Sequence, residues 1–500
     1  MTASRIRRPA FLLACTVLYF LGTAARASWK PFWYDELWTF HMSQLPGAAS
    51  IVRTMSATHE TMPPLLYILT HATGRIFGYG EVGLRVPEMV GFWIMCLALF
   101  SLVERHASGA AAATAMLFPC FTGVYEYAYE ARPYGVLLGL YAIALVCWQR
   151  ATGGTAEKPR TWWLTGFAVS LLGVIHCHFY GVLLLGPLGL AEAVRLVRRR
   201  RPDWPLWAIL AACPATLLAY RALLAPAAQQ AVKWARPEPS GLPDTYQLFQ
   251  VAWIPVLGFL VCLAAGMARG LPAEPGGGKA PGWSWSKEEG WLAVAIAFVP
   301  VGTLIFAGTV SGMYSNRYAL AAVIGFSLLA GMGTQWSGLC RGKGGARLVT
   351  LCVAGSFAIE QIFSIGMGYA SSPEPPSYPE PAAGPIVVTD SRLLVEMMHY
   401  ATPALKDHLL YLTDDQAALQ YNHHKAGEEG LRVFGLLAPV PVAPYRTWVE
   451  AHRRFRLFGR WGSAFDWIGP KLLDDGATLR FLGQYGPYRY FEVSWPGPGG

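Results

Sequence analysis

Long apolar runs separated by short polar segments make up most of the chain. About eleven of these runs approach the roughly 20 residues that an α-helix needs to cross a bilayer. They are residues 9–27, 86–103, 109–124, 133–148, 162–180, 181–197, 204–224, 246–268, 291–310, 317–336 and 347–369. The pattern predicts a mainly α protein, a polytopic transmembrane helix bundle of about eleven spans over residues 1–370.

The pattern changes after residue 370. Residues 371–384 are rich in proline and read as a linker. Beyond them, residues 385–500 carry short alternating elements in place of long runs. Two strand–helix–strand patterns are predicted, at 385–390, 391–401 and 408–413 and again at 455–460, 465–477 and 478–495. These elements predict a small α/β domain outside the membrane.

Basic residues indicate how the bundle is oriented, because Lys and Arg in short loops are retained in the cytoplasm. With about eleven spans, the amino terminus and three basic loops lie on the same side of the membrane. Their basic residues are Arg5, Arg7 and Arg8; Arg150, Lys158 and Arg160; Arg198 to Arg201; and Arg341, Lys343 and Arg347. The amino terminus is therefore predicted to be cytoplasmic and the tail periplasmic or extracellular. The net charge of +9 follows from these loops and requires no nucleic-acid partner. Residues 1–27 also resemble a secretory signal, but we favour an uncleaved first helix.

Composition agrees with this assignment. The chain is 53% hydrophobic and 14% charged, with a mean hydropathy of +0.32, which is too apolar for a solvated surface of this size. The nine cysteines show no metal-ligand spacing, so a structural zinc site is not predicted.

Ionisable side chains on the predicted outer face are the candidates for chemistry, because charges near a bilayer usually face a cavity or the water boundary. Carboxylates can act as general bases toward a hydroxyl, and arginines suit phosphate. Carboxylates together with histidine could also hold a divalent cation. The candidates are Asp35, Glu36, His59, Glu60, Arg85, Glu126, Glu130, Arg132, His176, His178 and Arg317.

Each candidate also has a purely structural interpretation. Asp35 and Glu36, in KPFWYDELWTF, are equally consistent with a solvated loop among interfacial aromatics. Glu60 could simply precede the helix that opens at the Pro-Pro pair. Arg85 fits a snorkelling anchor at a helix start, and His176 and His178 fit core or interface histidines.

Five short motifs, in order along residues 10–340, resemble the GT-C glycosyltransferases, and most closely the protein O-mannosyltransferase-like and RgtA/B/C/D-like branch. They are WYDE, ETMPPLLY, LR-x-P, EARPY and the RY pair at residues 317–318. The resemblance implies an enzyme that moves a sugar from a polyprenyl-phosphate donor to a hydroxyl of a glycan, lipid or protein. The transfer would take place on the outer face of the cytoplasmic membrane and invert the anomeric centre.

The resemblance also implies roles for individual residues. Asp35 would be the catalytic base and Glu36 its support. The donor phosphate would bind Arg132, Arg317 and Arg85. Glu60, with His59 and Glu130, would assist a divalent cation or support the site. The sequence departs from the E-K-P-P-L of related aminoarabinose transferases, having no lysine before the Pro-Pro pair, so phosphate binding falls to arginines and metal dependence stays open.

Two other functions are compatible with ionisable residues on the outer face of the membrane. A transporter or lipid flippase would carry ionisable residues near the bilayer midplane and internal repeats. Neither is apparent: a run such as GVLLLGPLGLAEAV carries only Glu192, near its end. A noncatalytic sensor with a membrane anchor would not need about eleven spans.

Overall fold

The computed structural model describes residues 3–58, 62–153, 159–220, 238–252, 285–337, 340, 343–370, 377–380, 384–463 and 465–495. The chain forms two compact units. The first, the helical bundle, comprises Met1–Ser28 and Gly47–Ala370. The second, the α/β unit, comprises Trp29–Pro46 and Ser371–Gly500.

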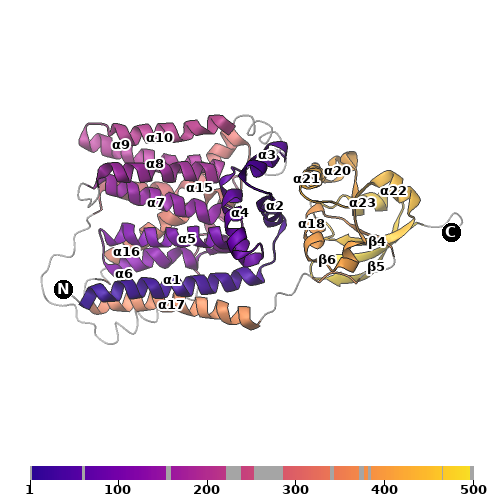
Figure 1. Ribbon diagram of the computed structural model, residues 1–500, viewed down its shortest axis with the longest axis horizontal. Helices are drawn as coiled ribbons and strands as arrows, with labels where there is room; N and C mark the ends of the chain where they lie inside the picture. The colour runs from indigo at the N-terminus through magenta and orange to yellow at the C-terminus, as the bar shows by residue number, and fades with distance from the viewer. Residues whose placement is uncertain are drawn as a thin grey trace. The chain divides into compact units, whose positions relative to one another are not determined.

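The long helices of the bundle run alongside one another (Figure 1). The described helices are α1 Ala3–Trp29, α3 Ala48–Thr58, α4 Leu65–Phe77, α5 Glu81–Glu104, α6 Gly109–Leu117, α7 Tyr134–Thr152, α8 Arg160–Cys177, α9 Leu185–Arg199, α10 Trp204–Ala215, α12 Gly241–Gln247, α14 Lys287–Ala297, α15 Val299–Phe306, α16 Ala322–Trp336 and α17 Lys343–Ala370. Short 3₁₀ turns connect several of them, including Gly123–Tyr129 before α7, Phe179–Leu184 before α9 and Asn316–Ala319 before α16.

Five described helices are long and apolar enough to cross a bilayer, and a pair bent by 55° brings the number to six if it forms one span. The five are Arg8–Trp29, Glu81–Glu104, Tyr134–Thr152, Phe179–Arg199 and Gly344–Met367, and the bent pair is Lys287–Ala297 with Val299–Ser311. The protein is therefore a multi-pass membrane protein, as predicted.

The number of full-length spans among the described residues is smaller than the predicted eleven. Runs 109–124 and 204–224 form the shorter apolar helices Gly109–Phe121 and Trp204–Tyr220. Pro119 and Pro214 lie where these helices turn into 3₁₀ geometry, which a proline favours because it removes an α-helical hydrogen bond. Most of run 246–268 lies outside the described residues.

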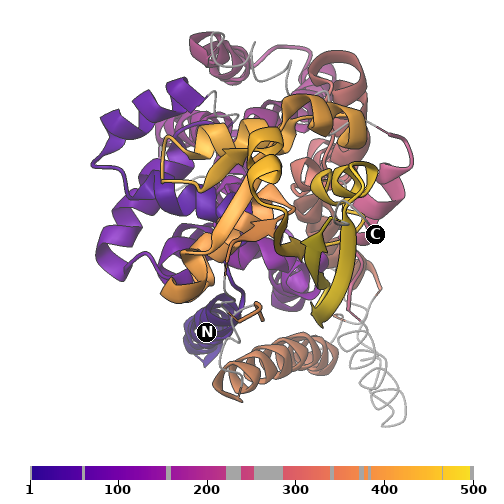
Figure 2. The ribbon, with the colours of Figure 1, turned by 90° about the vertical axis from the view of Figure 1, so that its right-hand side faces the viewer.

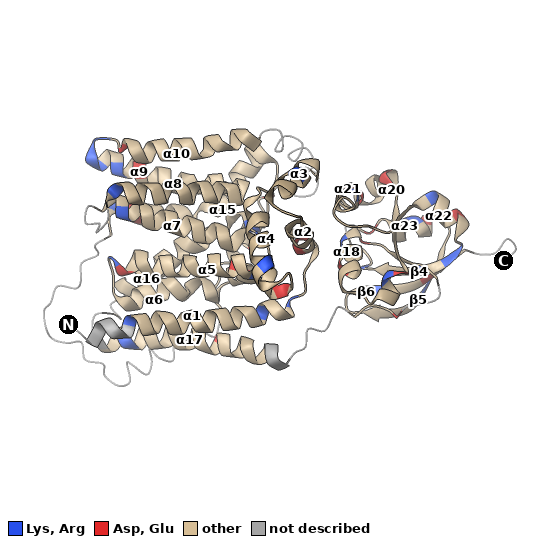
Figure 3. Ribbon diagram, in the orientation of Figure 1, with Lys and Arg blue, Asp and Glu red and all other residues tan. Residues whose placement is uncertain are grey.

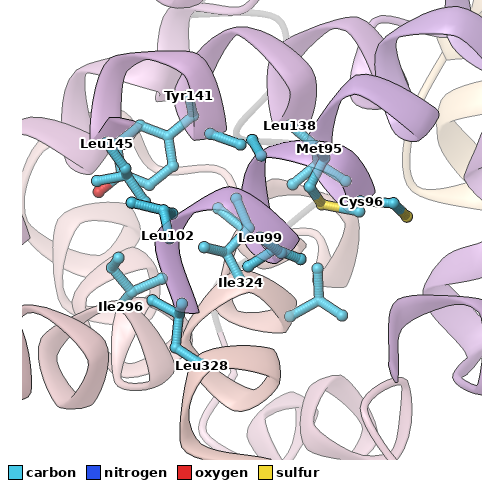
Figure 4. Close-up of a cluster of buried hydrophobic side chains, with 14 of the residues drawn as sticks. Met95, Cys96, Leu99, Leu102, Leu138, Tyr141, Leu145, Ile296, Ile324 and Leu328 are labelled. Carbon is cyan, nitrogen blue, oxygen red and sulfur yellow. The ribbon is translucent and has the colours of Figure 1, made fainter. Parts of the chain in front are cut away.

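The core of the bundle is built around α5 and α7 (Figure 4). Met95, Leu99, Leu138 and Tyr141 from these helices are buried with Ile324 of α16.

Glycines allow α5 and α7 to approach closely. A Cβ on Gly135 would lie 2.4 Å from the Glu88 carbonyl oxygen, and one on Gly91 would lie 2.5 Å from Cα of Val136. Such small-residue contacts are typical of helix pairs in membranes, where close packing replaces the hydrophobic driving force.

Two ion pairs lie at the end of the bundle where α1 begins. Arg8 at the start of α1 pairs with Glu104 at the end of α5 at 2.5 Å, and Arg160 at the start of α8 pairs with Asp203 before α10 at 2.5 Å. Figure 3 shows Lys and Arg gathered at this end, while the middles of the long helices are largely uncharged. Because α1 and α8 begin here, they end at the opposite end, where α5 and α7 begin.

The α/β unit is built on one six-stranded sheet of order β3-β2-β1-β4-β6-β5. The strands are β1 Ile386–Val388, β2 Leu409–Thr413, β3 Val442–Pro444, β4 Arg454–Gly459, β5 Thr478–Tyr485 and β6 Tyr488–Ser494. The first four in this order are parallel, and β6 and β5 add in antiparallel fashion. Figure 2 shows these strands in orange and yellow with helices of the same unit beside them. The helices are α2 Tyr34–Ser43, α18 Ser391–Tyr400, α19 Pro403–Lys406, α20 Asp415–Asn422, α21 Ala426–Phe434, α22 Tyr445–Ala451 and α23 Ile468–Asp474.

The predicted α/β character of the tail is confirmed, with one correction. Residues 478–495, predicted as one strand, form the hairpin β5–β6. Gly486 at its turn has a φ of +58°, which favours glycine over any residue with a side chain.

The segment Trp29–Pro46 belongs to the α/β unit although it precedes the tail by more than 300 residues of sequence. Residues 28–85, between the first two predicted spans, are therefore divided, since residues from Gly47 onward belong to the bundle. The physical reason is an aromatic contact: the ring centroids of Phe40 and His399 are 4.9 Å apart, and those of His41 and Phe434 are 5.1 Å apart.

Candidate active site

Asp35 and Glu36 lie in the first turn of α2, directly after the aromatic residues of WYDE. Carboxylates are favourable at this position because they complement the positive end of the helix dipole. Backbone hydrogen bonds to the Trp33 carbonyl, from the amides of Glu36 at 2.9 Å and Leu37 at 3.0 Å, fix the start of the helix. Glu36 is fully buried, and Asp35 is partly exposed. The two neighbouring carboxylates are thus in different environments, as a base and its support would be.

A second group of candidates lies at the end of the bundle where α7 begins. We call Arg132, Arg317, Tyr127, Tyr134, His178 and Tyr318 the arginine–aromatic cluster. Its rings form a continuous series, with centroid distances of 5.1 Å from Tyr127 to Tyr134, 5.8 Å from Tyr134 to His178 and 5.1 Å from His178 to Tyr318. The guanidinium groups of Arg132 and Arg317 both act electrostatically on Tyr134 and His178. The structure therefore brings together two arginines that are almost 200 residues apart in sequence.

Short backbone turns position Arg132. Its amide donates to the Glu130 carbonyl at 2.7 Å, and the Tyr134 amide donates to the Arg132 carbonyl at 2.7 Å. These successive three-residue turns, followed by Pro133 at the start of α7, hold the EARPY motif in a tight conformation. Arg132 is 7% exposed. A buried guanidinium is expensive to desolvate, so it is retained only where anionic groups or hydrogen-bond acceptors compensate its charge, and a phosphate group is one such partner.

The chemistry of the cluster suits a phosphate ester. Two guanidinium groups supply charge and directed N–H donors. The tyrosines provide hydroxyl groups and apolar ring faces.

Arg85 joins two helices of the bundle. It is fully buried in α5, and its Nη1 donates to the Ala27 carbonyl near the end of α1 at 2.6 Å. Full burial differs from the snorkelling anchor considered for it, whose head group would reach water. The bond ties the start of α5 to the end of α1.

Glu88, which follows Arg85 by three residues, was not among the sequence candidates. It is fully buried, accepts a hydrogen bond from the Val136 amide at 2.9 Å, and lies within electrostatic range of Arg132. Glu88 could have been found from the LRVPE motif, of which it is the last residue. An ionisable residue inside an apolar helix is a candidate functional residue because of its position alone. His178 also belongs to the cluster, although the structural interpretation was preferred from sequence.

The candidate metal ligands are only partly visible. His59 and Glu60 lie outside the described residues. Glu130 is 6% exposed and lies within electrostatic range of Tyr127 and Glu88. Among the described residues, no group of three or more His, Cys, Asp or Glu side chains is arranged to hold a metal ion.

Comparison with known proteins finds a family model that matches part of the chain. The model of the family described as dolichyl-phosphate-mannose-protein mannosyltransferase matches residues 61–201, which include ETMPPLLY from its threonine onward, LRVPE and EARPY. No curated protein matches the sequence.

Two solved structures share the fold over almost the whole chain. Both are of ArnT from Cupriavidus metallidurans, one in the apo state and one bound to undecaprenyl phosphate. The TM-scores are 0.55 and 0.57, with 14% sequence identity and 98% of each chain covered in both cases. The predicted resemblance to the GT-C membrane glycosyltransferases is therefore confirmed, by the family model over residues 61–201 and by the fold over nearly the whole chain.

Proposed function

We propose that this chain transfers a sugar from a polyprenyl-phosphate donor to a hydroxyl group of a glycan, lipid or protein acceptor. The reaction would take place on the outer face of the cytoplasmic membrane. The amino terminus would be cytoplasmic and the α/β unit periplasmic or extracellular, because the basic end of the bundle is expected to remain inside. A donor carried by lipid suits this face, where nucleotide sugars are not available.

The observation that carries the proposal is the arginine–aromatic cluster, considered together with the fold. Two arginines from distant segments act on the same pair of rings, at the end of the bundle opposite the Arg8–Glu104 and Arg160–Asp203 ion pairs. The fold of this chain is shared with ArnT from Cupriavidus metallidurans, one structure of which is bound to undecaprenyl phosphate. A lipid-linked phosphate fits this combination, since its charge suits the arginines and its chain suits the apolar helices.

The reaction would proceed in one displacement. The Asp35 carboxylate takes the proton from the acceptor hydroxyl, whose oxygen then attacks the anomeric carbon of the sugar. The bond between this carbon and the phosphate oxygen breaks, and the configuration inverts. Arg132 and Arg317 stabilise the charge on the departing polyprenyl phosphate. Glu36 supports Asp35, and Arg85 contributes to the phosphate site by fixing the start of α5.

A divalent cation would be held in this proposal by Glu60, with His59 and Glu130 as support, and would supply positive charge to the phosphate. Transfer measured before and after treatment with a chelator tests this point. Lost activity that Mg²⁺ or Mn²⁺ restores would support a cation, and unchanged activity would exclude one.

The decisive experiment combines lipid identification with a transfer assay. Mass spectrometry of lipid that copurifies with the protein should find a polyprenyl phosphate or its sugar ester. Purified protein should then move the sugar of that ester to an added acceptor fraction from the cell envelope. If the protein moved the intact lipid-linked sugar across vesicle membranes without transferring the sugar, the rival flippase function would be correct.

A further inference from the structure

The helix that carries the proposed base is held by the α/β unit. We propose that this unit positions the acidic segment Trp29–Pro46 for catalysis, with Glu396 and Tyr400 of α18 as positioning residues. The inference rests on the proposed function, in which Asp35 is the base. The α/β unit would then contribute to the transfer reaction by positioning the segment that carries Asp35.

Hydrogen bonds from α18 hold the backbone just before the two carboxylates. The Phe32 amide donates to the Tyr400 hydroxyl at 2.5 Å. The Tyr34 amide donates to the Glu396 carboxyl group. Because Glu396 and Tyr400 are four residues apart on one helix, they share a face and contact the same stretch of chain.

The bond from Glu396 acts as a helix cap. The first amides of a helix have no partner within it, and a side chain of the preceding residue usually supplies one. In α2 the N-cap residue is Trp33, whose side chain makes no such bond. A carboxyl group from α18 therefore takes over this task at Tyr34, the residue that directly precedes Asp35.

Aromatic contacts fix the remaining turns of α2. The rings of Phe32, Phe40 and His399 pack together as a group of three, with centroid distances of 5.9 Å from Phe32 to His399, 4.9 Å from Phe40 to His399 and 6.0 Å between the two phenylalanines. Further along the chain, Phe434 of α21 packs with Trp38 at 6.1 Å.

The same ring of Phe434 lies 6.4 Å from that of Tyr34. The Tyr34 hydroxyl lies against Gly430, where an added Cβ would be 2.9 Å away. Residues from both ends of α2 are thus in contact with α18 and α21.

These contacts matter for chemistry because they set the position of Asp35, not merely its environment. A general base must lie within hydrogen-bond reach of its proton, and a misplacement of about 1 Å can lower a rate on the order of 100-fold. The anchors hold residues 32 and 34, immediately before Asp35. Removing these two hydrogen bonds should displace Asp35 while leaving the arginine–aromatic cluster unchanged.

The test uses the full-length protein with Glu396→Ala, Glu396→Gln and Tyr400→Phe. Tyr421→Phe is the matched control, because it removes a tyrosine hydroxyl that bonds to Asp474 at 2.6 Å elsewhere in the same unit. Hydrogen–deuterium exchange of peptides covering residues 29–46 reports the anchoring, and steady-state kinetics report kcat and the donor KM.

Glu396→Ala and Tyr400→Phe should raise exchange in residues 29–46 at least several-fold, while exchange in β1 and β4 stays at the wild-type level. They should lower kcat by about 10- to 100-fold with the donor KM unchanged. Glu396→Gln, which keeps an acceptor oxygen, should restore most of kcat, and Tyr421→Phe should resemble wild type.

Three results would overturn the inference. Exchange that rises throughout the α/β unit would mean that these residues only stabilise it. Exchange that does not rise in residues 29–46 would mean that α18 is not the anchor. Faster exchange in residues 29–46 with wild-type kcat would mean that the anchoring has no catalytic role. Failure of the proposed function is recognised separately, because wild-type protein would then transfer no sugar while the exchange results still hold.

Discussion

The Glu88 carboxylate accepts a hydrogen bond of 2.9 Å from the backbone amide of Val136, and this bond joins α5 to the first turn of α7. Glu88 is fully buried, and the neighbouring Gly135 allows the two helices to touch. The bond thereby fixes the turn that carries Arg132.

Replacing Glu88 with alanine should destabilise the bundle, because it leaves a buried amide without its acceptor. We expect a loss of about 1–3 kcal/mol in the free energy of unfolding, and a smaller loss for Glu88→Gln, which retains an oxygen. Thermal unfolding in detergent measures both. Glu126→Gln, at an exposed carboxylate in the preceding 3₁₀ turn, is the control and should change little. An alanine variant as stable as wild type would show that water can replace this bond.

Asp35→Asn should abolish sugar transfer, because an amide cannot accept the acceptor's proton. The side chain is partly exposed at a helix start, so expression and melting temperature should remain near wild type. Transfer of radiolabelled sugar from the lipid donor is the measurement. Asp407→Asn, at an exposed aspartate that ends α19, controls for loss of a carboxylate in the same unit. Transfer by Asp35→Asn at the wild-type rate would remove Asp35 from the mechanism.

Arg317→Ala should weaken binding of the lipid-phosphate donor more than binding of the acceptor, because the guanidinium group is proposed to contact the phosphate. Loss of one charge-assisted contact corresponds to about 1.5–3 kcal/mol, or roughly 10- to 100-fold in donor affinity. The separate KM values for donor and acceptor measure the effect.

Arg132→Ala should behave in the same way, since both arginines act on Tyr134 and His178. Arg75→Ala, at an exposed position in the last turn of α4, is the matched control. Equal weakening of donor and acceptor binding would indicate that Arg317 supports the site as a whole rather than the phosphate.

Much of the fold follows from local patterns in the sequence, but the span count shows their limit. Hydropathy located the long helices α1, α5, α7 and α17 because a bilayer imposes a length and an apolar composition on each span separately. Whether a shorter apolar run forms one straight span depends on prolines and on neighbours, as at Pro119 and Pro214.

The two arginines of the candidate site are predicted from the sequence, but Glu88, the tyrosines of the cluster and the arrangement of the site are not. WYDE and EARPY are visible as charged motifs between apolar runs. The docking of Phe32 on Tyr400 is not, because it joins segments 368 positions apart that share no local pattern. Likewise nothing near His178 in sequence indicates that it contacts Tyr318; the contact follows from helix packing.

The stability of the α/β unit should fall as pH rises from about 4 to about 7. Burial, with a smaller effect of the nearby Asp390 carboxylate, raises the pKa of Asp466 to about 7. Between its unfolded pKa, near 4, and this value, the folded state binds the proton that the unfolded state has lost, so unfolding becomes easier with rising pH. Burial likewise raises the pKa of Glu396 to about 7, which adds to the slope.

Asp466→Asn, which cannot ionise, should flatten the dependence of stability on pH without removing it. Hydrogen exchange of β1 in the full-length protein, measured over this pH range, gives the slope. If wild type and Asp466→Asn lost protection equally with pH, another group would control the dependence. If protection did not fall with pH in wild type, neither carboxyl group would hold in the folded state a proton that the unfolded state has lost.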